Sequence, residues 1–261
     1  MTAPTVSPAP AALSVTALSV HYGGIAAVAD VGLAVPPAQI VGLIGPNGAG
    51  KTTLIDAMTG FTRCTGRVHV GGRDISALPP DERSRAGLTC TWQSAELFDD
   101  LSVRENVAVA SVPPTWRQLA REIVTGRPWR PGRTDEILAR LGLSDVADSR
   151  PDRLSTGLRK LVGVARALAP APHVVCLDEP AAGLDGEESQ LLGQQLRELA
   201  ADGTAMLLVD HDMRLVLSVC DQIFVLESGK IIASGPPAQI RSEPRVIEAY
   251  LGSAAAEVIR R

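Results

Sequence analysis

The chain has 261 residues, of which 45 % are hydrophobic and 21 % charged, a composition typical of a globular protein with a sizeable core. A net charge of −4 and an aromatic content of 3 % argue against binding through a basic surface or base stacking, so we expect no nucleic acid partner. The four scattered cysteines lack the close spacing of a zinc or disulfide framework and indicate a reducing compartment.

The first residues of the chain are rich in proline, alanine, serine and threonine and contain no lysine or arginine. This composition predicts a disordered tail over residues 1–12 rather than a secretion signal. No apolar run reaches the roughly 20 residues that a membrane-spanning helix needs. If the protein serves a membrane, we therefore expect it to act from the cytoplasmic face through partners.

The N-terminal third contains short β-rich runs at residues 13–20, 25–35 and 39–44. The third run is continuously apolar and ends in glycine, as a buried strand does where it enters a loop. The middle of the chain has a different texture, with a helical pattern, prolines and many arginines. We predict that this part, at about 94–160, is a helical lobe inserted into the first.

Apolar runs return in the C-terminal part of the chain and predict further strands at 174–177, 205–209 and 223–226. The segment 186–201 lies between the first two of these strands and has leucines at helical spacing, with charged residues on the opposite face of the predicted helix. Strand, helix and strand in succession imply a parallel sheet with crossover helices.

The predicted strand at 39–44 leads without a gap into the phosphate-loop pattern G-x-x-x-x-G-K-[ST]. Its residues are Gly45, Pro46, Asn47, Gly48, Ala49, Gly50, Lys51 and Thr52, and Thr53 follows as a further expected nucleotide contact. Glycines let successive N–H groups converge on phosphate oxygens, and a helix starting near Lys51 would direct its positive end there. Lys51 would contact the β and γ phosphates, and the Thr52 hydroxyl would bind Mg²⁺. The pattern therefore predicts nucleotide binding.

The predicted strand at 174–177 ends in two adjacent carboxylates, Asp178 and Glu179. Asp178 would hold Mg²⁺, directly or through water, as a hard oxygen ligand. Glu179 would take a proton from the attacking water. By itself such a pair is usually solvated acid at a loop, but the phosphate loop upstream favours the functional interpretation.

The segment Leu154-Ser155-Thr156-Gly157-Leu158, with the helical run 159–168 and the acid pair after it, resembles the signature segment of ABC ATPases. The resemblance covers about residues 13–252, with a C-terminal tail at 253–261. It implies an α/β fold of the P-loop NTPase class, with a RecA-like parallel-sheet core, an N-terminal antiparallel β subdomain and the inserted helical lobe. It also implies hydrolysis of ATP to ADP and phosphate, with ATP and Mg²⁺ bound.

Further landmarks of the ABC family follow in order, and the resemblance implies a role for each. Tyr22 would stack on the adenine, Gln93 would touch Mg²⁺ and face the membrane partner, and His211 would sense the γ phosphate. The segment 180–185, which ends in Asp185, would communicate across a dimer. By residue type alone, Tyr22 and Gln93 are more often plain surface or core, and His211 is as easily a solvated helix cap. Their order around two phosphate motifs is what favours the functional roles.

Residues 178–184, 210–213 and 246–252 resemble, more narrowly, the ATPases of branched-chain amino-acid importers, a group with relatives that serve urea and short amides. The resemblance implies a peripheral subunit on the cytoplasmic face of the cell membrane. Its partners would be a second ATPase subunit in a head-to-tail dimer, two integral-membrane permeases and, indirectly, a periplasmic or extracellular solute-binding protein.

The signature segment departs from the family pattern at Thr156, where glycine is usual, and at Leu158, where a polar Gln or Glu is usual. Ser155 and Gly157 keep the expected side chains, one to cap the helix and reach a γ phosphate, the other for close backbone approach. In ABC dimers this segment completes the partner's site. We therefore predict that this chain pairs with a different ATPase chain. Of the two nucleotide sites in that dimer, the one completed by Ser155 to Leu158 would be the weaker.

Two other functions remain open from the sequence. One is an ABC ATPase without a transport role, in translation, DNA repair or cluster assembly; the translation type usually has two such domains, and the repair type needs zinc cysteines or long coiled-coil insertions. The other is a regulatory subunit that only binds ATP, which Thr156 and Leu158 leave open but the intact Lys51, Asp178 and Glu179 oppose. A G protein is disfavoured because no Asn-Lys-x-Asp motif is present.

Overall fold

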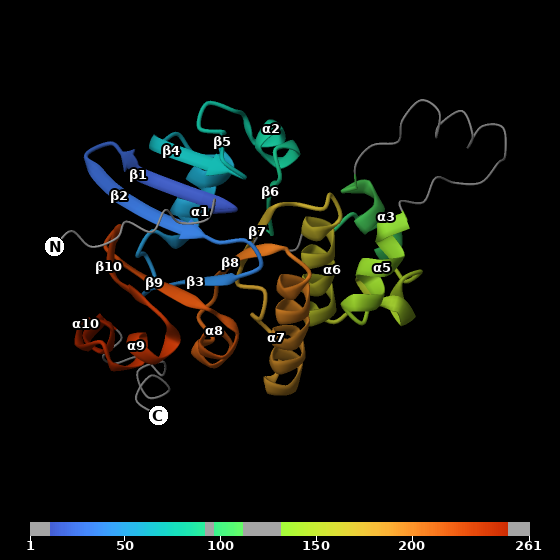
Figure 1. Ribbon diagram of the computed structural model, residues 1–261. Helices are drawn as coiled ribbons and strands as arrows, with labels where there is room; N and C mark the ends of the chain where they lie inside the picture. Colours follow the sequence, from blue (N-terminus) through green and yellow to red (C-terminus); the bar gives the residue numbers. More distant parts are fainter. Residues whose placement is uncertain (1–10, 92–96, 112–131, 250–261) are drawn as a thin grey trace.

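The computed structural model describes residues 11–91, 97–111 and 132–249, which form two β-sheets and the helices packed around them (Figure 1). The larger sheet has the strand order β10-β9-β3-β8-β7-β6, and all neighbours pair in parallel except β10 with β9. Its strands are β3 (Ile40–Ile44), β6 (Leu88–Cys90), β7 (Val174–Asp178), β8 (Ala205–Val209), β9 (Gln222–Glu227) and β10 (Lys230–Gly235).

The smaller sheet is antiparallel, with the order β2-β1-β4-β5. Its strands are β1 (Leu13–Tyr22), β2 (Ile25–Val35), β4 (Thr65–Val70) and β5 (Arg73–Asp74). Helix α1 (Lys51–Thr59) contributes Leu54 and Met58 to the core that the two sheets share. The first helix of the fold is thus enclosed between the sheets, with its N-terminus at the end of β3.

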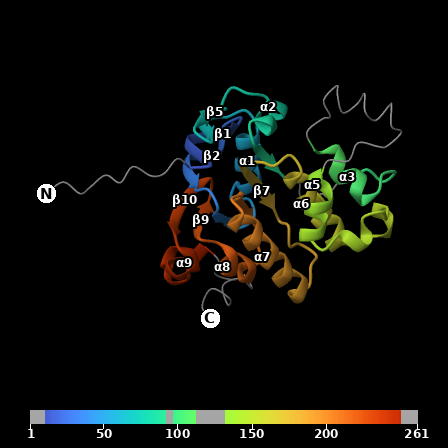
Figure 2. The same cartoon turned by 45° about the vertical axis from the view of Figure 1, so that its right-hand side comes forward.

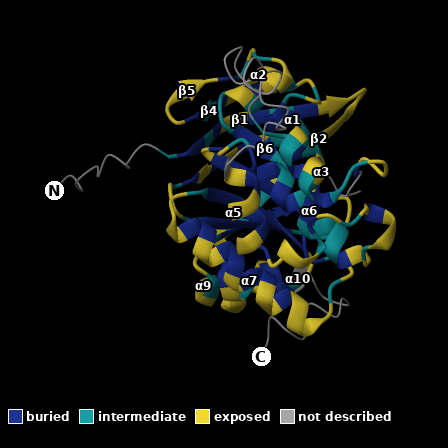
Figure 3. Cartoon of the chain, turned by 90° about the vertical axis from the view of Figure 1, so that its right-hand side faces the viewer, coloured by how far each residue is buried: buried dark blue, intermediate teal, exposed yellow. Residues whose placement is uncertain are grey.

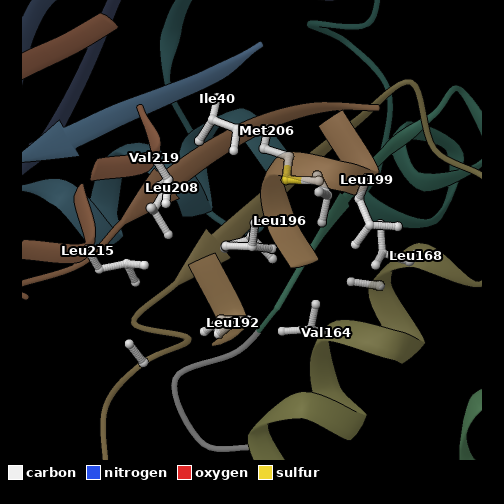
Figure 4. Close-up of a cluster of buried hydrophobic side chains, with 14 of the residues drawn as sticks. Ile40, Val164, Leu168, Leu192, Leu196, Leu199, Met206, Leu208, Leu215 and Val219 are labelled. Atoms are coloured by element: carbon white, nitrogen blue, oxygen red, sulfur yellow. The ribbon is translucent and has the colours of Figure 1, made fainter. Parts of the chain in front are cut away.

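The larger sheet is apolar on both faces because each face has its own core. Ile40 and Ile44 of β3 belong to one cluster, with α6, α7 and α8, whereas Val41 and Leu43 belong to the other, with α1 and the antiparallel sheet. Figure 4 shows the first cluster, in which strand residues meet the leucines of α7 and two residues of α6. A strand covered on both sides explains the continuous apolar run in the sequence.

The remaining helices cover the larger sheet or extend beyond it. They are α2 (Pro80–Arg85), α3 (Val103–Val109), α5 (Gly132–Arg140), α6 (Thr156–Leu168), α7 (Gly186–Ala201), α8 (Met213–Val219), α9 (Pro237–Ser242) and α10 (Pro244–Ala249), with 3₁₀ turns at Ser144–Val146 and Pro151–Arg153. In Figures 1 and 2, α3 and α5 lie on the far side of α6 from the strands. Figure 3 shows exposed residues on the outer surfaces of these helices and buried ones between them. Among the described residues, no helix has the length and apolar character needed to cross a bilayer.

The element boundaries differ from the sequence prediction mainly at strand and helix ends. The helix predicted at 186–201 and the strand at 205–209 coincide with α7 and β8, and β1 continues to Tyr22 rather than ending at 20. Helix α6 begins at Thr156, earlier than the predicted 159, because Ser155 caps it. Ala12, which the sequence predicts to lie in the disordered tail, is instead buried, and its carbonyl accepts from the Gly71 N–H at 2.9 Å.

A buried arginine joins α1 to the loop before α2. The Arg83 guanidinium donates to the carbonyls of Ala57 and Met58, at the end of α1, and to those of Ser76 and Leu78. Cationic donors suit the last turn of a helix because its free carbonyls carry the negative end of the helix dipole. Only 4 % of Arg83 is exposed, so water cannot replace these bonds.

We expect Arg83→Met to destabilise the protein by about 3 kcal/mol, since several buried carbonyls would lose their donor. The measurement is the urea-unfolding free energy. Arg85→Met is the matched control: its ion pair with Asp81 is 74 % and 62 % exposed, so the loss should stay below about 0.5 kcal/mol. Equal losses for the two variants would contradict this account.

Candidate nucleotide site

The predicted phosphate loop lies between β3 and α1, and its first and last glycines, Gly45 and Gly50, stand where a side chain has no room. A Cβ on Gly45 would lie 2.1 Å from the Leu226 carbonyl oxygen, and one on Gly50 would lie 2.5 Å from that of Ala27. Gly50 also has a φ of 104°, a left-handed conformation that L side chains avoid. The neighbouring strands β9 and β2 therefore confine the loop, and helix α1 begins directly after it at Lys51.

Lys51 bends back over the loop it follows. Its Nζ donates to the carbonyls of Gly45 and Pro46, at 2.8 and 3.0 Å. Partial burial lowers the pKa of this ammonium group, and the carboxylates of Glu179 and Asp178 oppose that effect. The amine is thus held at the mouth of the loop, on the side that faces the acid pair. Thr52 is exposed and Thr53 half-buried in the next positions of α1, and the loop residues Asn47 and Gly48 are also exposed.

The acid pair and His211 reach the same edge of the sheet from neighbouring strands. The strand order β3-β8-β7 places the loop after β3, Asp210 and His211 after β8, and Asp178 and Glu179 at the end of β7 (Figure 1). Carboxyl ends of parallel strands form one rim, which is where open α/β sheets bind ligands. The structure thereby brings together the sequence-predicted residues Lys51, Asp178, Glu179 and His211.

Glu179 reverses the chain directly after β7 in a conformation that is unusual for a residue with a side chain. Its φ is 49°, in the left-handed region, which is unfavourable by about 1–2 kcal/mol for such a residue. Its N–H donates to the Val209 carbonyl at 2.7 Å, and its carbonyl accepts from Lys160 Nζ at 2.9 Å. Strained backbone that is held from both sides is typical of functional positions.

Asp178 is buried, with 7 % of the residue exposed, and stands beside a second carboxylate. Burial, followed by the charge of Glu179, raises its pKa to about 6, although Lys51 opposes the rise. A carboxylate that is this poorly compensated by protein cations is suited to a hard divalent cation, and Thr52 offers a hydroxyl at the start of α1. The donor set therefore fits Mg²⁺.

His211 is exposed and lies between acidic neighbours. Its Nδ1 is 3.7 Å from Asp210 Oδ1 and 4.0 Å from Glu179 Oε1. The cap of α8 is not His211 but Asp212, whose Oδ1 accepts from the N–H groups of Arg214 and Leu215. With the cap supplied by Asp212, the imidazole remains available at the rim beside Glu179.

The two remaining predicted contacts, Tyr22 to the adenine and Gln93 to the metal, differ in what the structure describes. Tyr22 ends β1 and is 54 % exposed, with its hydroxyl 3.5 Å from Thr62 Oγ1, so its ring is accessible for stacking. Its hairpin partner β2 approaches the phosphate loop at Ala27. Gln93, predicted to contact the metal, lies outside the described residues.

A second group of predicted residues gathers where α6 meets the segment 180–185. Ser155 Oγ caps α6 by accepting from the Leu158 N–H at 3.2 Å. A Cβ on Gly157 would lie 2.4 Å from Leu184 Cδ2, so this glycine permits close packing within the chain. Leu158 is half-buried against the main core, and Asp185 caps α7 through the N–H groups of Glu187 and Glu188. The unusual leucine thus has a packing role, and the predicted Asp185 has a local one.

Three polar residues that contact the acid pair or the segment after it were not predicted as site residues from the sequence. Thr91 Oγ1 accepts from the Asp178 N–H at 2.9 Å, and buried Asp210 accepts from the N–H groups of Ala181 and Asp212. Lys160 reaches the Glu179 carbonyl. The position of Asp210 directly before His211 was a signal for it, but the other two act through contacts between distant segments that no local pattern encodes.

A groove of about 1130 Å³ lies between the α1–α2–β6 region and the α3–α6 region. We call it the inter-lobe groove; its lining includes Phe61, Ser84, Thr91, Leu97, Phe98 and Arg166. The Arg166 guanidinium lies 5.2 Å from the centre of the Phe98 ring, and partial burial lowers its pKa. Thr91 and Leu97, the described residues on either side of the segment 92–96, both line the groove.

Comparison with known proteins agrees with this geometry. The profile of the family described as ABC transporter matches residues 28–182, and that of the branched-chain amino acid ATP-binding cassette transporter matches residues 230–256. The chain belongs to the ABC transporter family, as one of its ATP-binding, ATP-hydrolysing subunits. The fold class predicted from the sequence is thereby confirmed, as is the resemblance to this family.

Individual relatives extend over nearly the whole chain. The high-affinity branched-chain amino acid transport ATP-binding protein LivG of Escherichia coli (strain K12) is 37 % identical over 93 % of this chain and 98 % of its own. The lipopolysaccharide export system ATP-binding protein LptB of Haemophilus influenzae is 36 % identical over 90 % and 95 %. A nucleotide-free ATP-binding cassette from an ABC transporter superposes with a TM-score of 0.81, at 30 % identity over 93 % of this chain and all (100 %) of the other.

We expect Asp178→Asn to stabilise the metal-free protein increasingly as the pH rises. The raised carboxyl pKa, about 6 against an ordinary 3.8, means that the folded state binds this proton more tightly. The associated stability is fully present below the unfolded value and is lost as the pH rises through about 6. Thermal unfolding without nucleotide or metal should show the variant's advantage growing by a few degrees from pH 5 to pH 7. An advantage that shrinks over this interval would refute the assignment.

Proposed function

We propose that this protein is the ATP-hydrolysing subunit of an importer that takes up branched-chain amino acids or a related small polar solute, and that it works at the cytoplasmic face of the cell membrane. The observation that supports the chemistry best is the meeting of the phosphate loop, the acid pair and His211 at one rim of the sheet. The similarity of residues 230–256 to the branched-chain cassette profile supports the cargo.

Each residue of the rim has a role in this proposal. The phosphate loop and Lys51 bind the ATP phosphates, Tyr22 packs on the adenine, and Thr52, Gln93 and Asp178 hold Mg²⁺, which neutralises phosphate charge when bound. Glu179 accepts the proton of the attacking water. His211, next to Glu179, donates to the γ phosphate and holds its orientation.

We further propose that two ATPase chains close head to tail, so that Ser155, Gly157 and Asp185 of one chain complete the site of the other. The N-terminus of α6 supports this role, because Ser155 and Thr156 are exposed there and the positive end of the helix dipole is therefore accessible to a phosphate. Leu158 packs inward and offers no polar group to the site that it would help to complete. This supports a different ATPase chain as partner, with weaker activity at the site that uses Ser155 to Leu158. Comparing phosphate release at the two sites, after the partner's catalytic glutamate is removed, tests that asymmetry.

The inter-lobe groove supports contact with two membrane-embedded permeases, one per ATPase chain. Its lining combines apolar rings with a cation and includes Thr91, whose hydroxyl accepts from the Asp178 N–H, so a permease segment seated there would lie near the metal site. Closure of the ATPase dimer would then move the permease, coupling hydrolysis to transport.

The first test uses the tagged full chain with Glu179→Gln, purified from native membranes in Mg²⁺-ATP. Without the proton acceptor, hydrolysis should fall by at least about 100-fold, so that a closed, ATP-bound dimer accumulates together with its permeases. Mass spectrometry should then identify two permeases and a second ATPase. Recovery of ribosomes, cluster-assembly proteins or no membrane protein would contradict the transport role, and wild-type hydrolysis would contradict the role of Glu179.

The second test concerns the inter-lobe groove. We expect Phe61→Asp to abolish permease recovery, because it places a charge among groove-lining apolar groups, while ATP binding by the isolated chain stays within about twofold. Leu191→Asp is the matched control, since Leu191 and Phe61 are both 55 % exposed but Leu191 lies on α7, outside the groove lining. Permease recovery that is equally reduced, or unaffected, in both variants would rule out this docking site.

A further inference from the structure

The start of α6 and the residues after β7 are joined by one charged contact and two close packing contacts. Lys160 Nζ donates to the Glu179 carbonyl at 2.9 Å. A Cβ on Gly157 would lie 2.4 Å from Leu184, and one on Gly183 would lie 3.5 Å from Thr156 Cγ2. The first turn of α6 therefore rests directly on the segment that begins at Glu179.

The Glu179 backbone is held by hydrogen bonds on both of its peptide groups. Its N–H donates to Val209, its carbonyl accepts from the Ala182 N–H at 3.3 Å, and Lys160 adds the charged donor to that same carbonyl. With φ at 49°, Glu179 is outside the conformations that its residue type prefers. A charge-assisted hydrogen bond is stronger than a neutral one, so Lys160 contributes substantially to maintaining this conformation.

We propose that Lys160 is a positioning residue for Glu179: by holding the peptide group that follows Glu179, it fixes the direction in which the carboxylate points. The proposal rests on the proposed function, in which Glu179 accepts the proton of the attacking water. No proton passes through Lys160, which only donates a hydrogen bond to a carbonyl oxygen.

The location of Lys160 also connects two sites within one chain. Lys160 and the capped N-terminus at Ser155 belong to the same end of α6. In the head-to-tail dimer, Ser155 serves the partner's nucleotide, whereas Glu179 serves this chain's own. A displacement of α6 on closure would therefore reach the Glu179 carbonyl directly through the hydrogen bond from Lys160, which makes hydrolysis at one site sensitive to closure over the other.

The experiment measures phosphate release by the assembly that the tagged full chain brings from membranes, or by the chain itself if it comes alone. Lys160→Met should lower kcat by about 10- to 100-fold with the KM for ATP within about twofold, because misdirected groups affect the reaction more than binding. Lys160→Arg, which retains a charged donor, should stay within about threefold of wild type. Arg159→Met is the matched control, since its partner is Asp99, 3.6 Å away, and should change kcat by less than about twofold.

A second readout separates positioning from support of α6 itself. If Lys160 acts through Glu179, the Lys160→Met variant still binds ATP, and its ATP-bound dimer accumulates in Mg²⁺-ATP as that of Glu179→Gln does. In that case the double variant Lys160→Met/Glu179→Gln forms the dimer to within about twofold of Glu179→Gln alone. If Lys160 instead supports the docking of α6 over the partner's nucleotide, Lys160→Met weakens the dimer in both backgrounds. Light scattering distinguishes these results, and the second overturns the proposal.

The two proposals fail in different ways. Wild-type hydrolysis by Glu179→Gln would remove the proposed role of Glu179, whereas an inactive Glu179→Gln beside a fully active Lys160→Met would remove only the role of Lys160. If Lys160→Met does not fold, the kcat values of Lys160→Gln and Lys160→Arg are compared instead. The glutamine side chain is shorter and uncharged, so its kcat should fall below that of the arginine variant, and equal rates would overturn the proposal.

Discussion

The parallel pairing of β3, β8 and β7 places the phosphate loop, the acid pair and His211 at one rim of the sheet. Asp178 is in register with Val209, so the residues that follow each strand emerge side by side. Because these strands are buried on both faces, a slip of one residue would move apolar side chains into the wrong core, and the register is therefore strongly specified. The hydrophobic packing of the sheet thus fixes the position of charged groups that take no part in that packing.

Charge at the rim is arranged for a ligand rather than for stability. Burial and, after it, the charge of Glu179 raise the pKa of Asp178, and Lys51 offsets only part of this rise. A protein selected for stability alone would avoid two adjacent carboxylates at the end of a buried strand. Glu179 adds backbone strain at the same place. Such departures from local preference are expected where binding or catalysis sets the requirement.

Most of the fold and of the site was predictable because its signals are local. The continuous apolar runs located the buried strands. The phosphate loop and the acid pair were recognisable because each comes directly at the end of one of these strands. Thr91, Lys160 and Arg83 were not predictable, because each side chain bonds to the backbone of a segment that only folding brings near. The inward packing of Leu158 likewise depends on the tertiary core, so its sequence pattern showed only that the usual polar group was missing.

Lys51 satisfies the phosphate loop from within, since its amine bonds to the carbonyls of Gly45 and Pro46. The loop therefore has an internal cation that donates to two of its carbonyls, one of which, that of Pro46, also accepts from the Ala49 N–H at 3.1 Å. Arrival of a nucleotide is then an exchange of partners for this amine, with little ordering of the surrounding backbone. A loop of this kind keeps its shape between successive nucleotides, so the next ATP can bind after each turnover without waiting for the loop to refold.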